Sequence, residues 1–522
     1  MKRLAAVLCC VALFCVLTAG CHKSPTDTPS ADSPRTTVPG TVSDTLSVAF
    51  NREDTLSPFA AKTALNWQLA SLLYDSLVRP DAAFSPVLSL AETAALTDNT
   101  HLTVTLRRRT FSDGSAVTVQ DVLYSFQAAK ASKNYRAALS NVSGAAGGKN
   151  SVTFTLSSPD PHAAACLYFP IIRQQTDTTE KAAAPVGSGP FVYHADTETL
   201  TANPHAAAQT AVKTVRLVHI VGNDMLPQNL ENGNIDYLYS DLRDGAIPRT
   251  TVKSATVDLN RLVYIGVNSG RAALSAPAVR QALSTALDRT SIAASAYTGR
   301  ALPATSPFHP NWRPASGLTV AAAASDGAAA TALLKTAQAT PTTTAAATTA
   351  ATTAATTAAT TTATTTAPTT AATAALPTEL TLIYSGGNSC REAAVKLVKK
   401  QLAHIGITVT GVPLSFADYQ KRLAAGDYDL YIGEIGLEPN MNLQVFFHAG
   451  GAAAFGVPTA GAAAAAYANY RQGTAPVGDF ITAFAAEMPY IPLCWLQGMV
   501  ASSRLASDTT PSAYALFDGI VN

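Results

Sequence analysis

Two aspartates and several hydroxyl side chains stand together in the segment TFSDGSAVTVQDVLYSF, residues 110–126. Two carboxylates can serve as general acid and general base in a hydrolase if they converge on one cleft. Each acid here also has a structural use. Asp113 and Gly114 form a turn dipeptide, because glycine adopts positive φ readily. Thr118 and Asp121 fit a capping box ahead of apolar residues. We therefore interpret the segment as a turn followed by a helix start, with no catalytic role.

Other catalytic motifs are missing from the sequence. It contains no Gly-x-Ser-x-Gly elbow, no Walker loop and no His-Glu-x-x-His, and its nine histidines are dispersed from His22 to His448. Ser188 stands between two glycines, but the following Pro190 indicates a turn and not a nucleophile elbow. We therefore expect that the protein is no enzyme and has no cofactor or metal. An extracytoplasmic enzyme is the alternative.

Strand-like and helix-like patterns alternate along the body of the chain. Apolar residues recur at every second position in 102–106 and 152–156, which predicts two half-buried strands. Helical spacing appears in 277–288 and 391–406, and a strand-like ITVTGV follows the second helix. This alternation, over more than 450 residues, predicts an α/β protein with at least two lobes.

The N-terminus has the three parts of a secretory signal. Lys2 and Arg3 precede an apolar run at 4–19, which is shorter than the roughly 20 residues of a membrane span. The sequence LTAGC that follows resembles the bacterial lipobox, so we expect residues 1–20 to be removed and Cys21 to carry lipid. The polar remainder of 21–43 is predicted to be a disordered stalk. A cleaved signal without lipid and an uncleaved anchor are the alternatives.

Charge and cysteine content exclude some classes of protein. A net charge of +1, with 14% charged residues, gives no field suited to nucleic acid. The basic runs Arg107–Arg109 and Lys396–Lys400 are interpreted as solvated strand and helix faces. Of seven cysteines, only Cys166, Cys390 and Cys494 lie beyond residue 21, too few and too scattered for a disulfide framework or a zinc motif.

A biased segment interrupts the second half of the chain. Residues 339–375 are all Ala, Thr or Pro, and no large apolar side chain among them could join a core. We predict a disordered, surface-exposed insertion that is open to glycosylation. An adhesive or stalk role is the alternative.

Several motifs together resemble one family, in that family's order. It comprises the periplasmic or lipid-anchored solute-binding proteins of oligopeptide, dipeptide and nickel ABC importers. The similar segments cover nearly all of residues 45–500. They are TLSPF (55–59), LLYDSLVRPD (72–81), LTVTLRRRTFSDGSAVTVQDVLYSF (102–126), PVGSGPF (185–191), LENGNIDYL (230–238), VYIGVNSGRAALSAPAVRQALSTALDRTSI (263–292), AAGDYDLYIG (424–433) and MPYIPLCW (488–495).

The resemblance implies a two-lobe α/β fold of the class II periplasmic-binding-protein type, cluster C, with an extra domain inserted in the first lobe. Ligand binds between the lobes, and closure presents the complex to a permease. The implied parts are lobe I at 44–58, 183–262 and 488–522, the extra domain at 59–182, and lobe II at 263–487 with the insertion inside it.

The resemblance also places one charged ligand residue. Peptide-binding members carry an aspartate shortly after the Asp-Tyr-Asp strand, in a Gly-Trp-x-x-Asp-Tyr context, and it pairs with the α-ammonium of the peptide. Here Ile435 stands at the tryptophan position and Glu438 at the aspartate position. Glu438 can still accept charge-assisted hydrogen bonds from an ammonium. A solvated loop glutamate is the alternative.

Other ligand contacts are implied at the lip of the cleft. Asn51 and Arg52 end the first strand, and Trp67 follows in a segment with polar neighbours, where it could equally be a core residue. No arginine stands at Ile432, and the basic groups considered instead for a ligand carboxylate are Arg391 and Arg313.

The functional expectation is a monomeric lipoprotein of an ABC importer. It would capture short peptides and deliver them to a membrane permease, held at the membrane by the lipid on Cys21. Alternative ligands are a nickel chelate, an oligosaccharide or an opine. A surface lipoprotein without a transport function is a further alternative.

Overall fold

One large mixed sheet organises the computed structural model, which describes residues 44–242, 245, 247–339, 376–505 and 511–521. Its strands run in the order β15-β14-β16-β12-β17-β11-β1-β10-β9-β8, and β13 pairs with β17 off this path. The strands are β1 (Thr45–Phe50), β8 (Phe191–His194), β9 (Thr199–Ala202), β10 (Thr214–His219), β11 (Tyr237–Ser240), β12 (Ser254–Val267), β13 (Ala301–Pro303), β14 (Glu379–Ser385), β15 (Thr408–Leu414), β16 (Leu430–Gly436) and β17 (Tyr490–Ser502).

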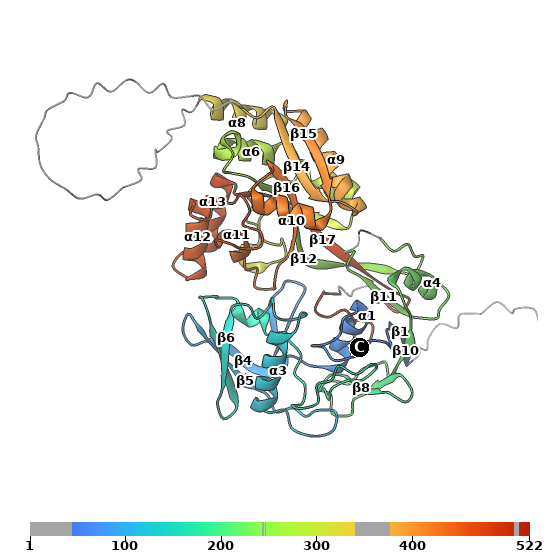
Figure 1. Ribbon diagram of the computed structural model, residues 1–522. Helices are drawn as coiled ribbons and strands as arrows, with labels where there is room; N and C mark the ends of the chain where they lie inside the picture. Colours follow the sequence, from blue (N-terminus) through green and yellow to red (C-terminus); the bar gives the residue numbers. More distant parts are fainter. Residues whose placement is uncertain (1–43, 243–244, 246, 340–375, 506–510, 522) are drawn as a thin grey trace, which may run out of the picture. The chain divides into compact units, whose positions relative to one another are not determined.

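Two long antiparallel strands, β12 and β17, join the two halves of this sheet (Figure 1). At one end β17 pairs with β11, which leads to β1 and β10. Toward the other end β12 pairs with β16, which leads to β14 and β15. All 13 residues of β17 are buried, as expected for a strand covered on both faces. The two groups of strands are therefore connected through a shared, buried strand pair.

A second sheet lies in the segment between β1 and β8. Four antiparallel strands run in the order β4-β5-β7-β6, and helix α3 packs against β6 and β7 (Figure 1). Both strands predicted from apolar alternation, at 102–106 and 152–156, are confirmed as β5 and β7. The elements are α1 (Ala64–Gln68), α2 (Ala70–Leu73), β2 (Val78–Pro80), β3 (Pro86–Leu88), β4 (Ala91–Leu96), β5 (His101–Leu106), α3 (Val119–Ala131), β6 (Val142–Gly147), β7 (Ser151–Leu156) and η1 (Ala163–Cys166).

Helices predominate in the second half of the chain. The predicted helix at 277–288 is confirmed as α6 but ends at Thr285, because the side chain of Asp288 caps the next helix by accepting a hydrogen bond from Ser291. The predicted helix at 391–406 is confirmed as α9, which packs on β15. The elements are η2 (Asn223–Met225), α4 (Leu226–Glu231), α5 (Ala272–Ser275), α6 (Pro277–Thr285), α7 (Arg289–Ala296), η3 (Arg313–Ala315), α8 (Gly327–Ala339), α9 (Ser389–Ala403), α10 (Phe416–Ala425), α11 (Gln444–Phe447), α12 (Ala462–Arg471) and α13 (Val477–Glu487).

The polar segment at 110–126 is a turn and a helix start, as predicted. Gly114 has φ +83°, and Asp113 accepts a hydrogen bond from the backbone N–H of Ser115 at 2.9 Å. Thr118 and Asp121 form a complete capping box at the start of α3. The other carboxylate oxygen of Asp121 accepts from the backbone N–H of Gln174 at 2.9 Å, which ties the helix start to a distant loop.

Removing the cap of α3 should cost measurable stability. We expect Thr118→Ala to lower the free energy of unfolding by about 1 kcal/mol, because the backbone N–H of Asp121 loses its acceptor. Urea unfolding followed by circular dichroism measures the change. Thr118→Ser keeps the oxygen and is the control. An equal decrease in the free energy of unfolding in Thr118→Ala and Thr118→Ser would contradict a stabilising role for the cap.

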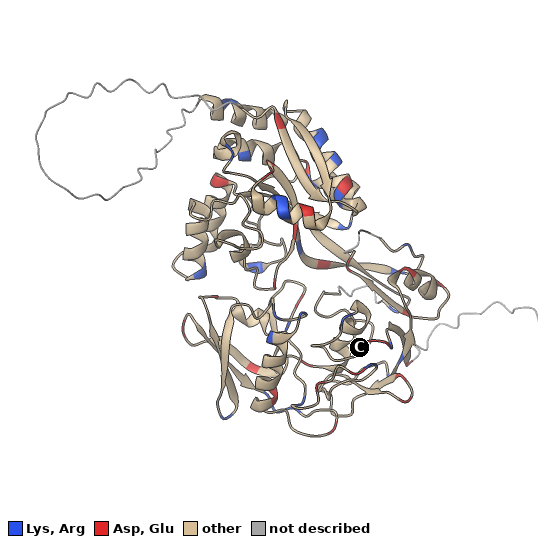
Figure 2. Cartoon of the chain, viewed as in Figure 1, with Lys and Arg blue, Asp and Glu red and all other residues tan. Residues whose placement is uncertain are grey.

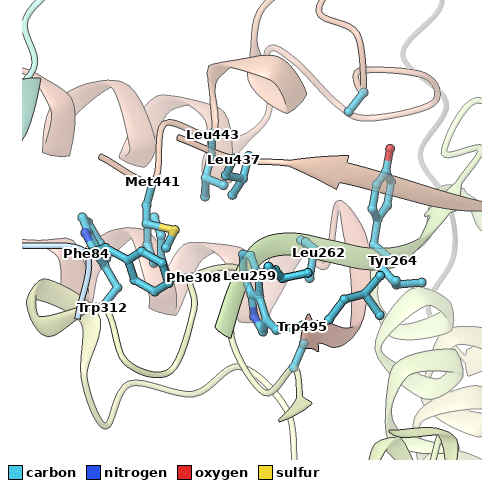
Figure 3. Packing of buried hydrophobic residues seen from close by; sticks show 14 of the residues in the cluster. Phe84, Leu259, Leu262, Tyr264, Phe308, Trp312, Leu437, Met441, Leu443 and Trp495 are labelled. Atoms are coloured by element: carbon cyan, nitrogen blue, oxygen red, sulfur yellow. The ribbon is translucent and has the colours of Figure 1, made fainter. Parts of the chain in front are cut away.

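Aromatic side chains distant in sequence pack into the core. Figure 3 shows Phe84, Phe308, Trp312 and Met441 in one group. The rings of Phe308 and Trp312 have centroids 4.7 Å apart, and Phe84 meets His309 edge-on at 4.8 Å. Such pairs add roughly 0.5–1.5 kcal/mol beyond their burial. Because Phe84 lies between β2 and β3, this core joins the small hairpin to the segment before η3.

Charged residues of both signs are interspersed along the described elements, and most of the chain is uncharged (Figure 2). Cys166, Cys390 and Cys494 are free thiols, in agreement with the absence of a predicted disulfide framework. No helix among the described residues is both long and apolar enough to cross a membrane. The predicted signal, Cys21 and stalk lie outside the described residues, as does the predicted insertion except Ala339, the last residue of α8.

Candidate ligand-binding cavity

A cavity of about 470 Å³ is lined by segments far apart in the sequence. One side comes from the start of α1 and the loop after α3. The other comes from β12, the end of β16 and the C-terminal segment around Tyr514. Cavities that take small organic ligands have roughly 300–1,000 Å³. This cavity therefore has the size of a ligand site, and it lies where the strand pair β12 and β17 connects the two groups of strands.

An irregularity in β12 presents polar groups to the cavity. The register between β12 and β17 shifts between Asp258 and Leu262, so Asn260 and Arg261 lie in a bulge. Bulges of this kind re-aim side chains beside functional sites. Oδ1 of Asn260 and Nη1 of Arg261 are buried and have no hydrogen-bond partner among the described residues. Both residues line the cavity, which leaves an acceptor and a donor available to a ligand.

Arg261 belongs to a chain of alternating charges. Its guanidinium lies 3.6 Å from Asp241 and 3.5 Å from Glu434, and Glu434 also pairs with Arg391 at 3.0 Å. The side chain of Arg261 is only 12% exposed. These contacts fix the position of the guanidinium without using all of its donors, because a guanidinium carries five N–H groups.

Glu438 supplies a carboxylate to the same cavity. It lies two residues beyond the end of β16, and the backbone N–H of Leu437 donates to the carbonyl of Asn260 at 2.6 Å. The hydroxyl of Tyr168 donates to Oε2 of Glu438 at 2.8 Å. Burial raises the pKa of Glu438 above its ordinary value, and the hydrogen bond from Tyr168 opposes part of that rise. The carboxylate is therefore short of counter-charge.

Aromatic rings and two lysines complete the lining. Tyr168 and Tyr514 meet edge-on with centroids 5.1 Å apart, and Trp67 of α1 lines the cavity beside them. Lys62 and Lys133 contribute ammonium groups from the side of α1 and α3. The lining thus combines two acids, three bases and flat apolar surfaces, which suits an organic ligand with both polar and apolar parts.

The structure brings together two of the four predicted ligand residues. Glu438 and Trp67 both line the cavity. Asn51 lies outside its lining, and the carbonyl of Asn51 accepts a hydrogen bond from the side chain of Asn66 at 2.9 Å. Arg52 also lies outside it and pairs with Glu198 at the surface. The roles predicted for Asn51 and Arg52 in ligand binding stay predictions.

Sequence reasoning missed the bulge residues and part of the aromatic wall. Of the two basic groups considered, Arg391 is bound to Glu434, which also contacts Arg261, and Arg313 is exposed in η3. Asn260 and Arg261 carried one signal, since they are two consecutive polar residues between Leu259 and the apolar run at 262–265. No local signal distinguishes Tyr168 or Tyr514 from an ordinary packing aromatic.

Comparison with known families settles the class of protein. Residues 85–454 match the model of the bacterial extracellular solute-binding proteins, family 5. The chain belongs to this family. It is therefore a substrate-binding protein of the ABC importer class, as the sequence motifs indicated, and its fold is the two-lobed α/β fold of periplasmic binding proteins. No curated protein matches the chain significantly in sequence.

Solved structures of this class superpose over nearly the whole chain. An ABC transporter substrate-binding protein, CtaP, from Listeria monocytogenes is 19% identical with a TM-score of 0.63, covering 90% of this chain and 97% of its own. NikA from Brucella suis, in complex with Fe(III)-EDTA, is 18% identical with a TM-score of 0.66, covering 91% and 99%. The oligopeptide-binding protein AppA from Bacillus subtilis, in complex with a nonapeptide, is 19% identical with a TM-score of 0.51, covering 91% and 97%. At these identities, the similarity to the three solved structures shows a shared fold alone.

Proposed function

We propose that this family 5 protein captures short peptides with a free α-ammonium group and delivers them to an ABC permease. The carrying observation is the partly desolvated carboxylate of Glu438 in a cavity that also holds buried polar atoms of Asn260 and Arg261 with no hydrogen-bond partner among the described residues. A peptide offers its ammonium group to Glu438 and its backbone N–H and carbonyl groups to Asn260 and Arg261.

The electrostatics of Glu438 favour a cationic partner. Its raised pKa reports that burial disfavours the charged carboxylate, and a single hydroxyl from Tyr168 offsets that only in part. An ammonium group within hydrogen-bond distance stabilises the ionised form by a charge-assisted bond. The free energy released on binding is largest where the carboxylate lacks such a partner beforehand.

Backbone recognition fits the remaining groups. Oδ1 of Asn260 can accept from a peptide N–H, and Nη1 of Arg261 can donate to a peptide carbonyl. Contacts to the main chain give affinity without selecting side chains, as in other clefts that take extended peptides. Trp67 and Tyr168 offer flat surfaces against which varied side chains can lie.

A metal chelate is the competing ligand, because NikA from Brucella suis was solved with Fe(III)-EDTA. The lining of the cavity includes no histidine or cysteine. Among the described residues no group of three or more His, Cys, Asp or Glu could hold a metal ion. Lys62, Lys133 and Arg261 could still attract an anionic chelate, so the test below includes one.

Several finer features of the proposal rest on the sequence. Lipid on Cys21 would hold the monomeric protein near its permease, with 21–43 as a tether and 1–20 removed. Ligand binding would bring lobe I and lobe II together, and the closed form would engage the permease. The domain boundaries given for both lobes, the extra domain at 59–182 and the insertion at 339–375 belong to the same proposal.

Thermal-shift measurements with defined ligands test the proposal. A ligand that binds only the folded state raises the melting temperature by mass action. At a free-ligand concentration one hundred times its dissociation constant, it raises the free energy of unfolding by about 2.7 kcal/mol. We expect di- to hexapeptides at millimolar concentration to raise it, and their N-acetylated forms to raise it much less. No shift with any peptide, together with a shift by Fe(III)-EDTA, an oligosaccharide or an opine, would contradict peptide capture.

A further inference from the structure

A second cavity, of about 400 Å³, adjoins the first. The two cavities share Trp67, Tyr168, Ala513 and Tyr514, so the same aromatic side chains form part of both walls. We name the first the Glu438 cavity and the second the Ser188 cavity. The rest of its lining includes residues of α1, α2, the β2–β3 hairpin and the loop after β5, with residues 206–208 and Thr210.

The turn at 187–190 builds one wall of the Ser188 cavity. Gly187 and Gly189 approach the backbone of Leu73 and Tyr74 so closely that a Cβ at either position would overlap it. The close approach holds Ser188 beside Asp75, and Ser188 is only 3% exposed. Its Oγ makes no hydrogen bond of normal geometry among the described residues, although it lies near enough to Asp75 to favour the charged carboxylate.

Three arginines line the same cavity and outnumber its one acid. Arg79 pairs with Asp518 at 3.2 Å, and Nε of Arg107 donates to the carbonyl of Ala91 at 2.9 Å. The side chain of Arg109 makes only one hydrogen bond, from Nη1 to the carbonyl of Arg108 at 3.3 Å, and no ion pair within the described part of the chain. Its remaining donors are available.

Asp75 limits the charge that the cavity can accept. Burial raises its pKa to about 6, and Ser188, Arg109 and Arg79 oppose the rise. A singly charged carboxylate therefore fits better than a phosphate, which would bring up to two negative charges against the same wall.

The geometry points to the Ser188 cavity as the site for the carboxylate end of the captured ligand, bound by Arg109 and by the hydroxyl of Ser188. This inference rests on the proposed function for the peptide itself. The peptide would place its ammonium at Glu438 and pass Trp67 and Tyr168, which both cavities share. A ligand with a free carboxylate at the far end would be preferred.

Neighbouring arginines provide a matched pair of variants. Arg109 lines the Ser188 cavity, whereas Arg108 next to it is exposed and lines neither cavity. Calorimetry would compare Arg109→Gln with Arg108→Gln, using a tetrapeptide with a free carboxyl terminus and the same peptide as its C-terminal amide. We expect the parent and Arg108→Gln to bind the free acid about tenfold or more tightly than the amide, and Arg109→Gln to lose that preference.

A second probe separates this inference from the proposed function. N-acetyl-leucine has a carboxylate but no ammonium, so it tests the Ser188 cavity without Glu438. If peptides bind, an undiminished preference for the free acid in Arg109→Gln overturns the inference. If no peptide binds, the proposed function fails, and the binding of N-acetyl-leucine then tests the inference about the Ser188 cavity by itself. Binding about tenfold weaker in Arg109→Gln than in Arg108→Gln supports the inference, whereas equal binding or none overturns it.

Discussion

Replacing Arg471 with leucine should destabilise the protein by about 3–5 kcal/mol, because it leaves the carboxylate of Asp160 buried without its cation. The two groups lie 2.8 Å apart, with side chains 4% and 1% exposed. Nδ2 of Asn440 donates to the same carboxylate at 2.6 Å, and the backbone N–H of His162 donates to its other oxygen at 2.9 Å. Neither bond supplies the lost positive charge.

The pair connects distant parts of the chain, which is why its loss should be felt throughout. Asp160 lies between β7 and η1, whereas Arg471 is the last residue of α12. Nearby, the side chains of His162 and Tyr470 are 2.8 Å apart. Opening this junction exposes buried polar groups and the aromatic core around Trp312 at once.

The control for Arg471→Leu is Arg79→Leu, since Arg79 pairs with Asp518 at 3.2 Å with both side chains well exposed. An exposed pair contributes about 0–1 kcal/mol, so this variant should unfold almost as the parent does. Urea unfolding followed by tryptophan fluorescence compares the two. Removing Asp160 as well should recover part of the loss, because no charge then stays unpaired. Similar small losses in both single variants would show that the buried pair is not held as described.

Local patterns in the sequence were sufficient for the individual elements. The capping box of Thr118 and Asp121 depends on residues three positions apart, and the alternation in β5 and β7 depends on neighbours within one strand. Such features survive any arrangement of the rest of the chain. The family motifs then predicted the order of the parts and the position of Glu438.

The cavity itself could not be predicted from local patterns. Asn260 and Arg261 face it because of a bulge, and that bulge is defined only by the register of β12 against β17, whose residues lie more than two hundred positions away. The run Arg107–Arg109 illustrates the same limit. Its interpretation as a solvated face agrees with the exposure of Arg107 and Arg108, but Arg107 and Arg109 also line a cavity together with Tyr514 and residues 206–208. The periodicity of apolar residues shows which face of one element is apolar. It does not show which other segments of the chain cover that face.

Replacing Glu438 with glutamine should weaken binding of peptides with a free ammonium by about tenfold or more, because a charge-assisted hydrogen bond becomes a neutral one. Glutamine keeps the size of the side chain and an acceptor for the hydroxyl of Tyr168. Binding of the N-acetylated peptide, which has no ammonium, should be nearly unchanged. Calorimetry with both peptides measures the two effects.

The pH dependence of binding supplies a second signature of Glu438. Its pKa is raised by burial, so lowering the pH protonates the carboxylate at a higher pH than for an ordinary glutamate. A protonated carboxyl cannot pair with the ammonium, so peptide affinity should fall as the pH decreases through that pKa. The fall should be absent in Glu438→Gln and present in Glu379→Gln, which alters an exposed residue at the start of β14. An identical pH profile in all three proteins, with no loss of affinity in Glu438→Gln, would exclude Glu438 as the partner of the ammonium and leave Lys62, Lys133 and Arg261 to define a cavity for anions.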